Sequence, residues 1–203
     1  MQRFRRRLSS IYSDDEERLL VPWQKIRQVF LAPLARLLSY LGITPDMLSF
    51  TSVGLGIVFF LLAPVNFTLA FWFLAASILC DGLDGVEARV TGKSAPGGAF
   101  TDMSCDLAVV AFSVAGMAWR GAISPVLAIL FVYLYTALVI FLLLHRLLLV
   151  SSRWILRPSR MLLYLAIALE FFFHIDLLND LLLLYLLFFP LLFLSFWRLR
   201  KAL

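Results

Sequence analysis

The sequence holds 203 residues, of which 62% are hydrophobic and only 15% are charged. A soluble globular protein of this length needs more polar side chains to cover its core, so this composition excludes a soluble fold and predicts a membrane protein built mostly of apolar helices. The formal net charge of +5 therefore points to membrane topology and anionic lipid head groups, and we expect no nucleic acid partner.

The N-terminal residues 1–21 are predicted to form a flexible polar tail, because they combine clustered arginines with an acidic run and few apolar side chains. From Pro22 onward, apolar residues recur every three or four positions, which is the spacing of one helix face. These residues are Trp23, Ile26, Phe30, Leu34, Leu37 and Leu41. We predict an amphipathic juxtamembrane helix over residues 22–42 that lies in the membrane interface; a soluble helix packed on a partner is the alternative.

The remaining residues, 43–203, are predicted to form one domain of six transmembrane helices. Gly42 ends the amphipathic helix, and Thr44 and Pro45 begin the next one as its N-cap and first helical residue. The six apolar segments, each close to the length that crosses a bilayer, are 46–63, 68–91, 98–119, 123–146, 158–175 and 178–197. The fifth is short and contains Glu170, and Pro190 is expected to kink the sixth. The predicted fold class is all-α integral membrane.

The basic residues are distributed unevenly along this predicted topology. With six spans, both termini lie on one side of the membrane, together with the loops 92–97 and 147–157. Of the 18 Lys and Arg residues, only Arg120 then lies on the other side. By the positive-inside rule, the N- and C-termini are expected to be cytoplasmic.

Four aspartates lie inside the second and third predicted spans, where ionisable residues are costly and therefore candidates for function. Asp81 and Asp84 are three residues apart and Asp102 and Asp106 four, so each pair shares one helix face. If a tight turn makes the two helices antiparallel neighbours, all four carboxylates lie about 6 to 15 Å from the same cytoplasmic end. Such oxygen ligands suit Mg²⁺, Mn²⁺ or Ca²⁺, and two ions sharing the carboxylates would neutralise the cluster and bind phosphate oxygens.

The four aspartates belong to a longer pattern of fixed residues, D-x2-D-G-x2-A-R-x8-G-x3-D-x3-D. The residues that meet it are Asp81, Asp84, Gly85, Ala88, Arg89, Gly98, Asp102 and Asp106. The chain thereby resembles the CDP-alcohol phosphatidyltransferases over roughly residues 22–197. It departs from them at Asp46, where many relatives carry Asn after Thr-Pro.

The resemblance implies transfer of a phosphatidyl-type group from a CDP-linked lipid donor to a polar alcohol acceptor, with release of CMP, by a homodimer among membrane lipids. It implies Mg²⁺ or Mn²⁺ as cofactor, with two ions. Asp81, Asp84 and Asp102 match metal ligands, and Asp106 matches a ligand that is also the catalytic base. The positions that match the CDP site are Gly85, Ala88, Arg89 and Gly98.

Three arginines before the fifth span lie on one face if that segment is helical; they are Arg153, Arg157 and Arg160. One interpretation is that they contact lipid head groups and set the topology. The other is that they bind the phosphate of the acceptor, because residues 157–160 resemble the paired-arginine segment of relatives that use inositol phosphate. The second interpretation favours CDP-diacylglycerol as donor and a phosphorylated polyol, such as glycerol phosphate or inositol phosphate, as acceptor.

Two other functions remain open at this point. One is a CDP-aminoalcohol phosphotransferase acting on a lipid alcohol. The other is a divalent-cation transporter, although a transport site is expected nearer the membrane midplane. Cys80 and Cys105 lie in apolar segments and are expected to pack without a disulfide. Glu170, His174 and Asp176 lie toward the opposite membrane face, where they either pair with one another or mark a hydrated helix end.

Overall fold

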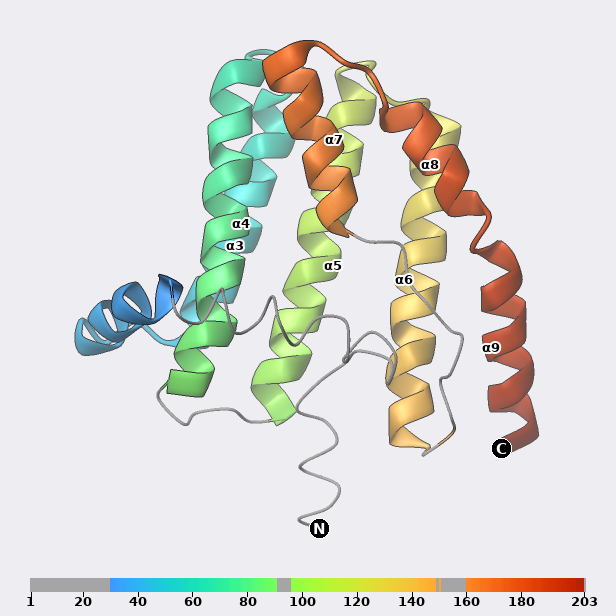
Figure 1. Ribbon diagram of the computed structural model, residues 1–203, viewed down its shortest axis with the longest axis horizontal. Coiled ribbons are helices and arrows are strands. Elements are labelled where there is room, and N and C mark those ends of the chain that lie inside the picture. Colours follow the sequence, from blue (N-terminus) through green and yellow to red (C-terminus); the bar gives the residue numbers. More distant parts are fainter. Residues whose placement is uncertain (1–29, 91–95, 149, 151–159, 203) are drawn as a thin grey trace.

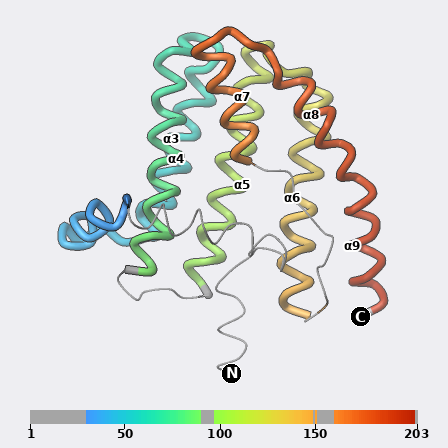
Figure 2. The backbone as a smooth tube through the Cα atoms, viewed as in Figure 1, coloured from blue at the N-terminus to red at the C-terminus, as the bar shows by residue number. Residues whose placement is uncertain are grey.

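The computed structural model describes residues 30–90, 96–148, 150 and 160–202, and all regular secondary structure in these ranges is helical. The labelled helices are α3 (Pro45–Leu62), α4 (Phe67–Val90), α5 (Pro96–Trp119), α6 (Pro125–Leu147), α7 (Arg160–Phe173), α8 (Leu178–Leu186) and α9 (Phe189–Ala202). They run back and forth between two ends of one bundle (Figure 1). The C-terminal end of α9 lies at the same end of the bundle as the last turn of α4 and the first turn of α5 (Figure 2). This end is called the α4–α5 end below.

Five helical stretches in the described residues are long and apolar enough to cross a membrane, with α8 and α9 taken as one. They correspond to the first four predicted spans and the sixth. The fifth predicted span corresponds to α7, which covers only 14 residues and begins partway along the bundle (Figure 1). Residues 158 and 159, where we expected this span to begin, lie outside the described ranges. The all-α membrane fold is confirmed, and the predicted six spans correspond to five long stretches plus this short helix.

Local backbone chemistry explains where the C-terminal helices end. His174 follows α7 with a φ of 55°, a left-handed conformation that terminates a helix. The backbone N–H of Ile175 then donates back to the carbonyl of Leu169 at 3.5 Å, which closes the last turn. Between α8 and α9 the helix is interrupted by a turn at residues 187–188, and Pro190 is the second residue of α9. Proline is tolerated there because an N–H in the first turn has no helical partner. Where we expected a kink at Pro190, the span is interrupted just before it.

A shorter apolar helix, Phe30–Tyr40, lies across the direction of the bundle (Figure 1). It forms the second half of the predicted amphipathic helix, whose first residues, 22–29, lie outside the described ranges. Phe30 and Leu37 of the predicted apolar stripe are exposed, whereas Ala35 is fully buried. An apolar stripe that faces away from the protein is expected of a helix lying in the membrane interface.

The turn after this helix has the predicted form. Gly42 adopts a φ of 78°, which a residue without a side chain accepts readily. The Thr44 hydroxyl then accepts a hydrogen bond from the backbone N–H of Met47 at 3.3 Å and caps α3. The start of α3 is thereby held beside the short helix.

Packing around α3 supports the two helices that carry the aspartates. α3 is the principal neighbour of both α4 and α5, which are antiparallel as predicted but touch each other little. At Gly116 of α5, an added Cβ would lie 3.1 Å from the Phe60 backbone of α3, so a side chain there would require the two helices to shift slightly apart. Because both helices pack on α3, the backbones of α4 and α5 stay apart, and the space between them is left for side chains.

The outer surface and the charge distribution suit a membrane-embedded bundle. Large apolar side chains are exposed on the outside of several helices, including Phe50, Trp72, Ile129 and Phe193. In the described part of the chain, Arg120 is the basic residue that follows α5 at the end opposite the α4–α5 end. Most others lie on the short helix or in the last turns of helices that finish at the α4–α5 end: Arg36, Arg89, Arg146, Arg198, Arg200 and Lys201.

Candidate active site

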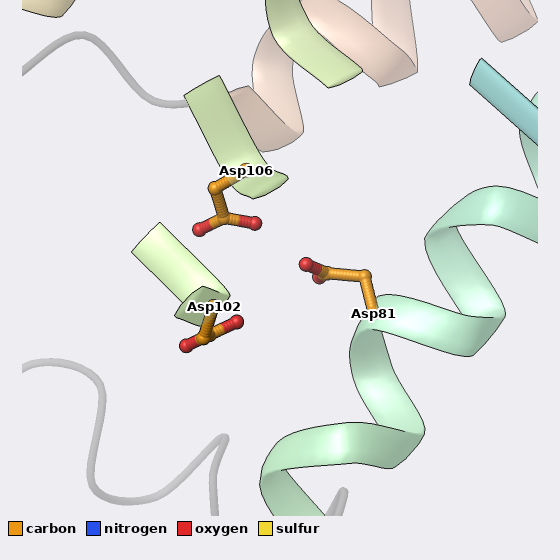
Figure 3. A group of neighbouring side chains, drawn as sticks. All are labelled: Asp81, Asp102 and Asp106. Carbon is orange, nitrogen blue, oxygen red and sulfur yellow. The ribbon is translucent and has the colours of Figure 1, made fainter. Parts of the chain in front are cut away.

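Three of the four predicted aspartates converge between α4 and α5. Asp81 projects from α4 and Asp102 and Asp106 from α5, with their carboxylates pointing into a common space (Figure 3). Each offers one oxygen, and these three oxygens lie within 4.8 Å of one another. The spacing of four residues between Asp102 and Asp106 puts both on the face of α5 that looks toward α4. We call Asp81, Asp102 and Asp106 the carboxylate triad.

The triad fits a hard divalent cation. Mg²⁺ and Ca²⁺ bind oxygen ligands at about 2.0 to 2.6 Å, so two ligands of one ion lie at most about 4 to 5 Å apart. The separation within the triad matches that limit. Carboxylate oxygens without nitrogen or sulfur ligands also suit Mg²⁺, Mn²⁺ and Ca²⁺ better than Zn²⁺ or copper.

Asp84, the fourth predicted metal ligand, lies outside the triad but next to it. Ser49 of α3 donates a hydrogen bond from its hydroxyl to Asp84 Oδ2 at 2.6 Å, and both residues are only 3% exposed. The Asp84 carboxylate nevertheless interacts electrostatically with Asp102 and with Asp81. Two side chains three residues apart on an α-helix point about 60° away from each other around the helix axis. Asp84 therefore points partly toward α3, while Asp81 points toward α5.

Arg160, the first residue of α7, binds the triad directly. Its guanidinium donates to both carboxylate oxygens of Asp81, at 3.0 Å from Nη2 and 3.3 Å from Nη1. The same Nη1 forms an ion pair with Asp106 Oδ1. The sequence left two interpretations for this arginine, contact with lipid head groups or binding of an acceptor phosphate, together with Arg153 and Arg157, which lie outside the described residues. The structure places its guanidinium between α4 and α5, on two of the triad carboxylates.

The residues that match a CDP site lie between the triad and the α4–α5 end. Gly85 and Ala88 are partly buried, and Arg89 is exposed in the last turn of α4. Gly98 lies in the first turn of α5, where an added Cβ would be 3.9 Å from Asp46 Oδ1. Asp46, which departs from the family pattern, therefore lies beside a predicted nucleotide position.

Sequence reasoning missed three buried serines between α3 and α4, one of which binds an aspartate of the site. Ser49 binds Asp84, and one turn further along α3 the hydroxyl of Ser52 lies 3.1 Å from that of Ser77 on α4. Ser77 also donates to the backbone carbonyl of Ser52 at 2.8 Å. The signal was present in the sequence, because two serines three apart in an apolar span share one face, and Ser77 precedes Asp81 by one turn.

The remaining polar residues take structural positions. Cys80 and Cys105 are free thiols, as predicted. At the opposite end of the bundle Glu170 forms an ion pair with Arg120, a partner that the sequence did not predict for this acid. Asp176 is exposed, and His174 forms the end of α7.

Comparison with known families agrees with this geometry. The family model for CDP-alcohol phosphatidyltransferases matches residues 42–197, which include every helix of the bundle that contributes to the triad. The chain belongs to the CDP-alcohol phosphatidyltransferase family. No individual curated protein matches it.

Membership settles the class of the protein. It is a multi-pass membrane transferase of the CDP-alcohol phosphatidyltransferase type, and the interpretation as a cation transporter falls away. Such enzymes act on a CDP-alcohol and an alcohol acceptor within membranes, in phospholipid synthesis, and generally depend on a divalent metal.

Proposed function

We propose that this enzyme transfers a phosphatidyl group from CDP-diacylglycerol to a phosphorylated polyol, such as glycerol phosphate or inositol phosphate, and releases CMP. The observation that carries this proposal is the carboxylate triad with the guanidinium of Arg160 against it, inside an apolar bundle. Anionic phosphates on donor and acceptor need several cations close together, and this arrangement can provide divalent ions and an arginine at one place.

The metal ligands in this proposal are Asp81, Asp102 and Asp106, with Asp84 beside them as the fourth carboxylate of a two-ion site for Mg²⁺ or Mn²⁺. The bound ions would neutralise the charge of the phosphates that react. Ser49 keeps the Asp84 carboxylate in a fixed orientation, because its short hydrogen bond leaves little freedom to a buried side chain.

The chemical step is a displacement at the phosphorus that carries the diacylglycerol. A bond forms between this phosphorus and the acceptor hydroxyl oxygen, and the bond to the phosphate oxygen of CMP breaks. Asp106 accepts the proton of the acceptor hydroxyl as the general base, and CMP leaves with the electron pair. Gly85, Ala88, Arg89 and Gly98 hold the CDP part of the donor toward the α4–α5 end.

The acceptor phosphate is assigned to Arg160, together with Arg153 and Arg157 from the segment that precedes α7. Arg160 supports this assignment because its guanidinium already lies within the reacting region and not on the lipid-facing surface. We further propose that the α4–α5 end and both termini face the cytoplasm, because the described basic residues gather there. From the family resemblance we also propose that the enzyme is a homodimer. The molecular mass of the purified protein in detergent tests this proposal.

An acceptor screen tests the proposed function. The purified enzyme is given CDP-diacylglycerol and Mg²⁺ or Mn²⁺, and CMP release is measured with glycerol phosphate, inositol phosphate, inositol or serine. We expect CMP release with one of the phosphorylated polyols and its loss on addition of EDTA. Activity only with an unphosphorylated alcohol would contradict the assignment of the arginines, and activity that survives EDTA would contradict the metal site.

A further inference from the structure

Arg160 is a largely buried cation inside an apolar bundle. It is the first described residue of α7, and its side chain is only 13% exposed. A guanidinium with so little contact with water is costly unless other groups compensate its charge. Its compensation comes from Asp81 of α4 and Asp106 of α5, the two carboxylates to which it is bound.

These contacts use the same atoms that a metal ion needs. Arg160 occupies both oxygens of Asp81 and the Oδ1 atom of Asp106. A divalent ion bound to these oxygens at about 2.0 to 2.6 Å would lie within a few ångströms of the guanidinium, where the two cations repel each other strongly in a medium of low dielectric constant. Arg160 therefore cannot keep its two hydrogen bonds to Asp81 and its ion pair with Asp106 while a divalent ion binds the same oxygens.

We infer that Arg160 is an internal counter-cation that competes with the divalent metal for Asp81 and Asp106, so that metal binding releases its guanidinium toward the acceptor phosphate. This inference rests on the metal site proposed above and adds an exchange of partners to it. One arginine neutralises part of the triad before the metal binds, and the same arginine then becomes available to an anion.

The exchange couples the metal to the acceptor. A phosphate that binds the released guanidinium removes the competitor of the metal, and by linkage the metal strengthens phosphate binding by the same factor. The coupling makes metal binding weaker in the absence of the phosphorylated acceptor than the triad alone would allow. An enzyme built in this way assembles its complete site only when both components are present.

Binding of Mn²⁺, measured from the electron paramagnetic resonance signal of the free ion, tests the competition without any turnover. We compare the wild-type protein with Arg160→Gln and Arg160→Lys in detergent. Loss of the hydrogen bonds to Asp81 and of the ion pair with Asp106 should tighten Mn²⁺ binding about tenfold or more in Arg160→Gln. Lysine keeps the charge but cannot bridge two carboxylates with a planar fork, so Arg160→Lys should tighten binding by a smaller factor.

The matched control is Arg200→Gln, which removes an exposed arginine of α9 at the same end of the bundle. It should bind Mn²⁺ like the wild-type protein, which separates local competition from a general change of surface charge. Thermal unfolding gives a second readout: Mn²⁺ should stabilise Arg160→Gln more than it stabilises the wild type, since the variant lacks its internal cation. If Arg160→Gln does not fold, Arg160→Lys carries the comparison alone.

Equal or weaker Mn²⁺ binding in the Arg160 variants would overturn the competition. The variant Asp102→Asn distinguishes this failure from a failure of the proposed function. If wild-type Mn²⁺ binding is lost in Asp102→Asn but unchanged in Arg160→Gln, the metal site stands and only the exchange is wrong. Absence of Mn²⁺ binding in wild-type and Arg160 variants alike would overturn both.

Discussion

The two ends of the bundle both place charged side chains among apolar helices, but they balance these charges differently. At the opposite end, one acid, Glu170, pairs with one base, Arg120, whose guanidinium also lies 3.9 Å from the ring centre of Phe67. Near the α4–α5 end, Arg160 binds two carboxylates of the triad, Asp81 and Asp106, and Asp102 and Asp84 place two further acids beside them.

The difference separates a structural pair from a functional cluster. A one-to-one ion pair compensates its own charge, so it can hold two helices together without any further partner. A surplus of carboxylates in a region of low dielectric constant is costly unless another cation joins it. The clustered carboxylates are therefore suited to binding a cation, whereas the one-to-one pair of Glu170 and Arg120 is suited to holding helices together.

The largest effect is expected from Asp106→Asn. The substitution keeps the shape of the side chain but removes a metal ligand, the proposed base and one partner of Arg160. Loss of general base catalysis alone costs about 10² to 10⁴ in rate, and the damaged metal site adds to it. Steady-state CMP release from the purified variant measures this loss.

Asp176→Asn is the control for that experiment, because it neutralises an exposed acid at the opposite end of the bundle. It should retain the activity of the wild-type enzyme. Normal turnover by Asp106→Asn would show that the base is another residue. Equal losses in both variants would contradict the distinction between the two ends.

A smaller effect on activity is expected from Ser49→Ala. The variant leaves Asp84 buried without its 2.6 Å hydrogen bond, so the carboxylate is free to turn away from the triad. Loss of a residue that orients a metal ligand typically costs about tenfold to a hundredfold in affinity or activity. The variant's kcat/KM for CMP release and its half-saturating Mn²⁺ concentration both report this loss.

Ser52→Ala is the matched control for Ser49→Ala. It removes a buried serine one turn away on the same helix, but the hydroxyl of Ser52 lies against Ser77 and not against a carboxylate. It should lower stability with little change in Mn²⁺ dependence. If the two variants behaved alike, Ser49 would serve the packing of α3 on α4 and not the orientation of Asp84.

Much of this arrangement follows from periodicity and charge in the sequence. The apolar segments predict the long helices, and the spacing of Asp102 and Asp106 predicts their common face because helix geometry is regular. Pro190 predicts the break in the last span since proline lacks a backbone donor. These inferences are local, and the structure agrees with them.

Contacts between distant segments escaped sequence reasoning. Asp84 turns to Ser49, 35 residues away, and Arg160 reaches Asp81 across 79 residues. Nothing in the spacing of one helix determines which neighbour captures a side chain, so the four equivalent aspartates of the pattern become three plus one only after α3 and α7 pack. The length of α7 also depends on such detail, because His174 ends it in a conformation that the sequence pattern does not reveal.

The smallest effect on activity is expected from Glu170→Gln at the opposite end. The Glu170 side chain is 11% exposed and its partner Arg120 is 30% exposed, so this ion pair is neither a fully exposed nor a fully buried salt bridge. Its loss should cost about 1 to 2 kcal/mol of stability, measured by thermal unfolding in detergent, while kcat for CMP release changes less than about twofold. The double variant Arg120→Met with Glu170→Gln should lose less stability than the two single variants added together, because each single change already removes the same interaction. A large loss of activity in Glu170→Gln at unchanged stability would mean that the opposite end influences the site. The route would be α7, the helix that carries both Glu170 and Arg160. Charge balance would then no longer distinguish structural from functional ion pairs in this enzyme.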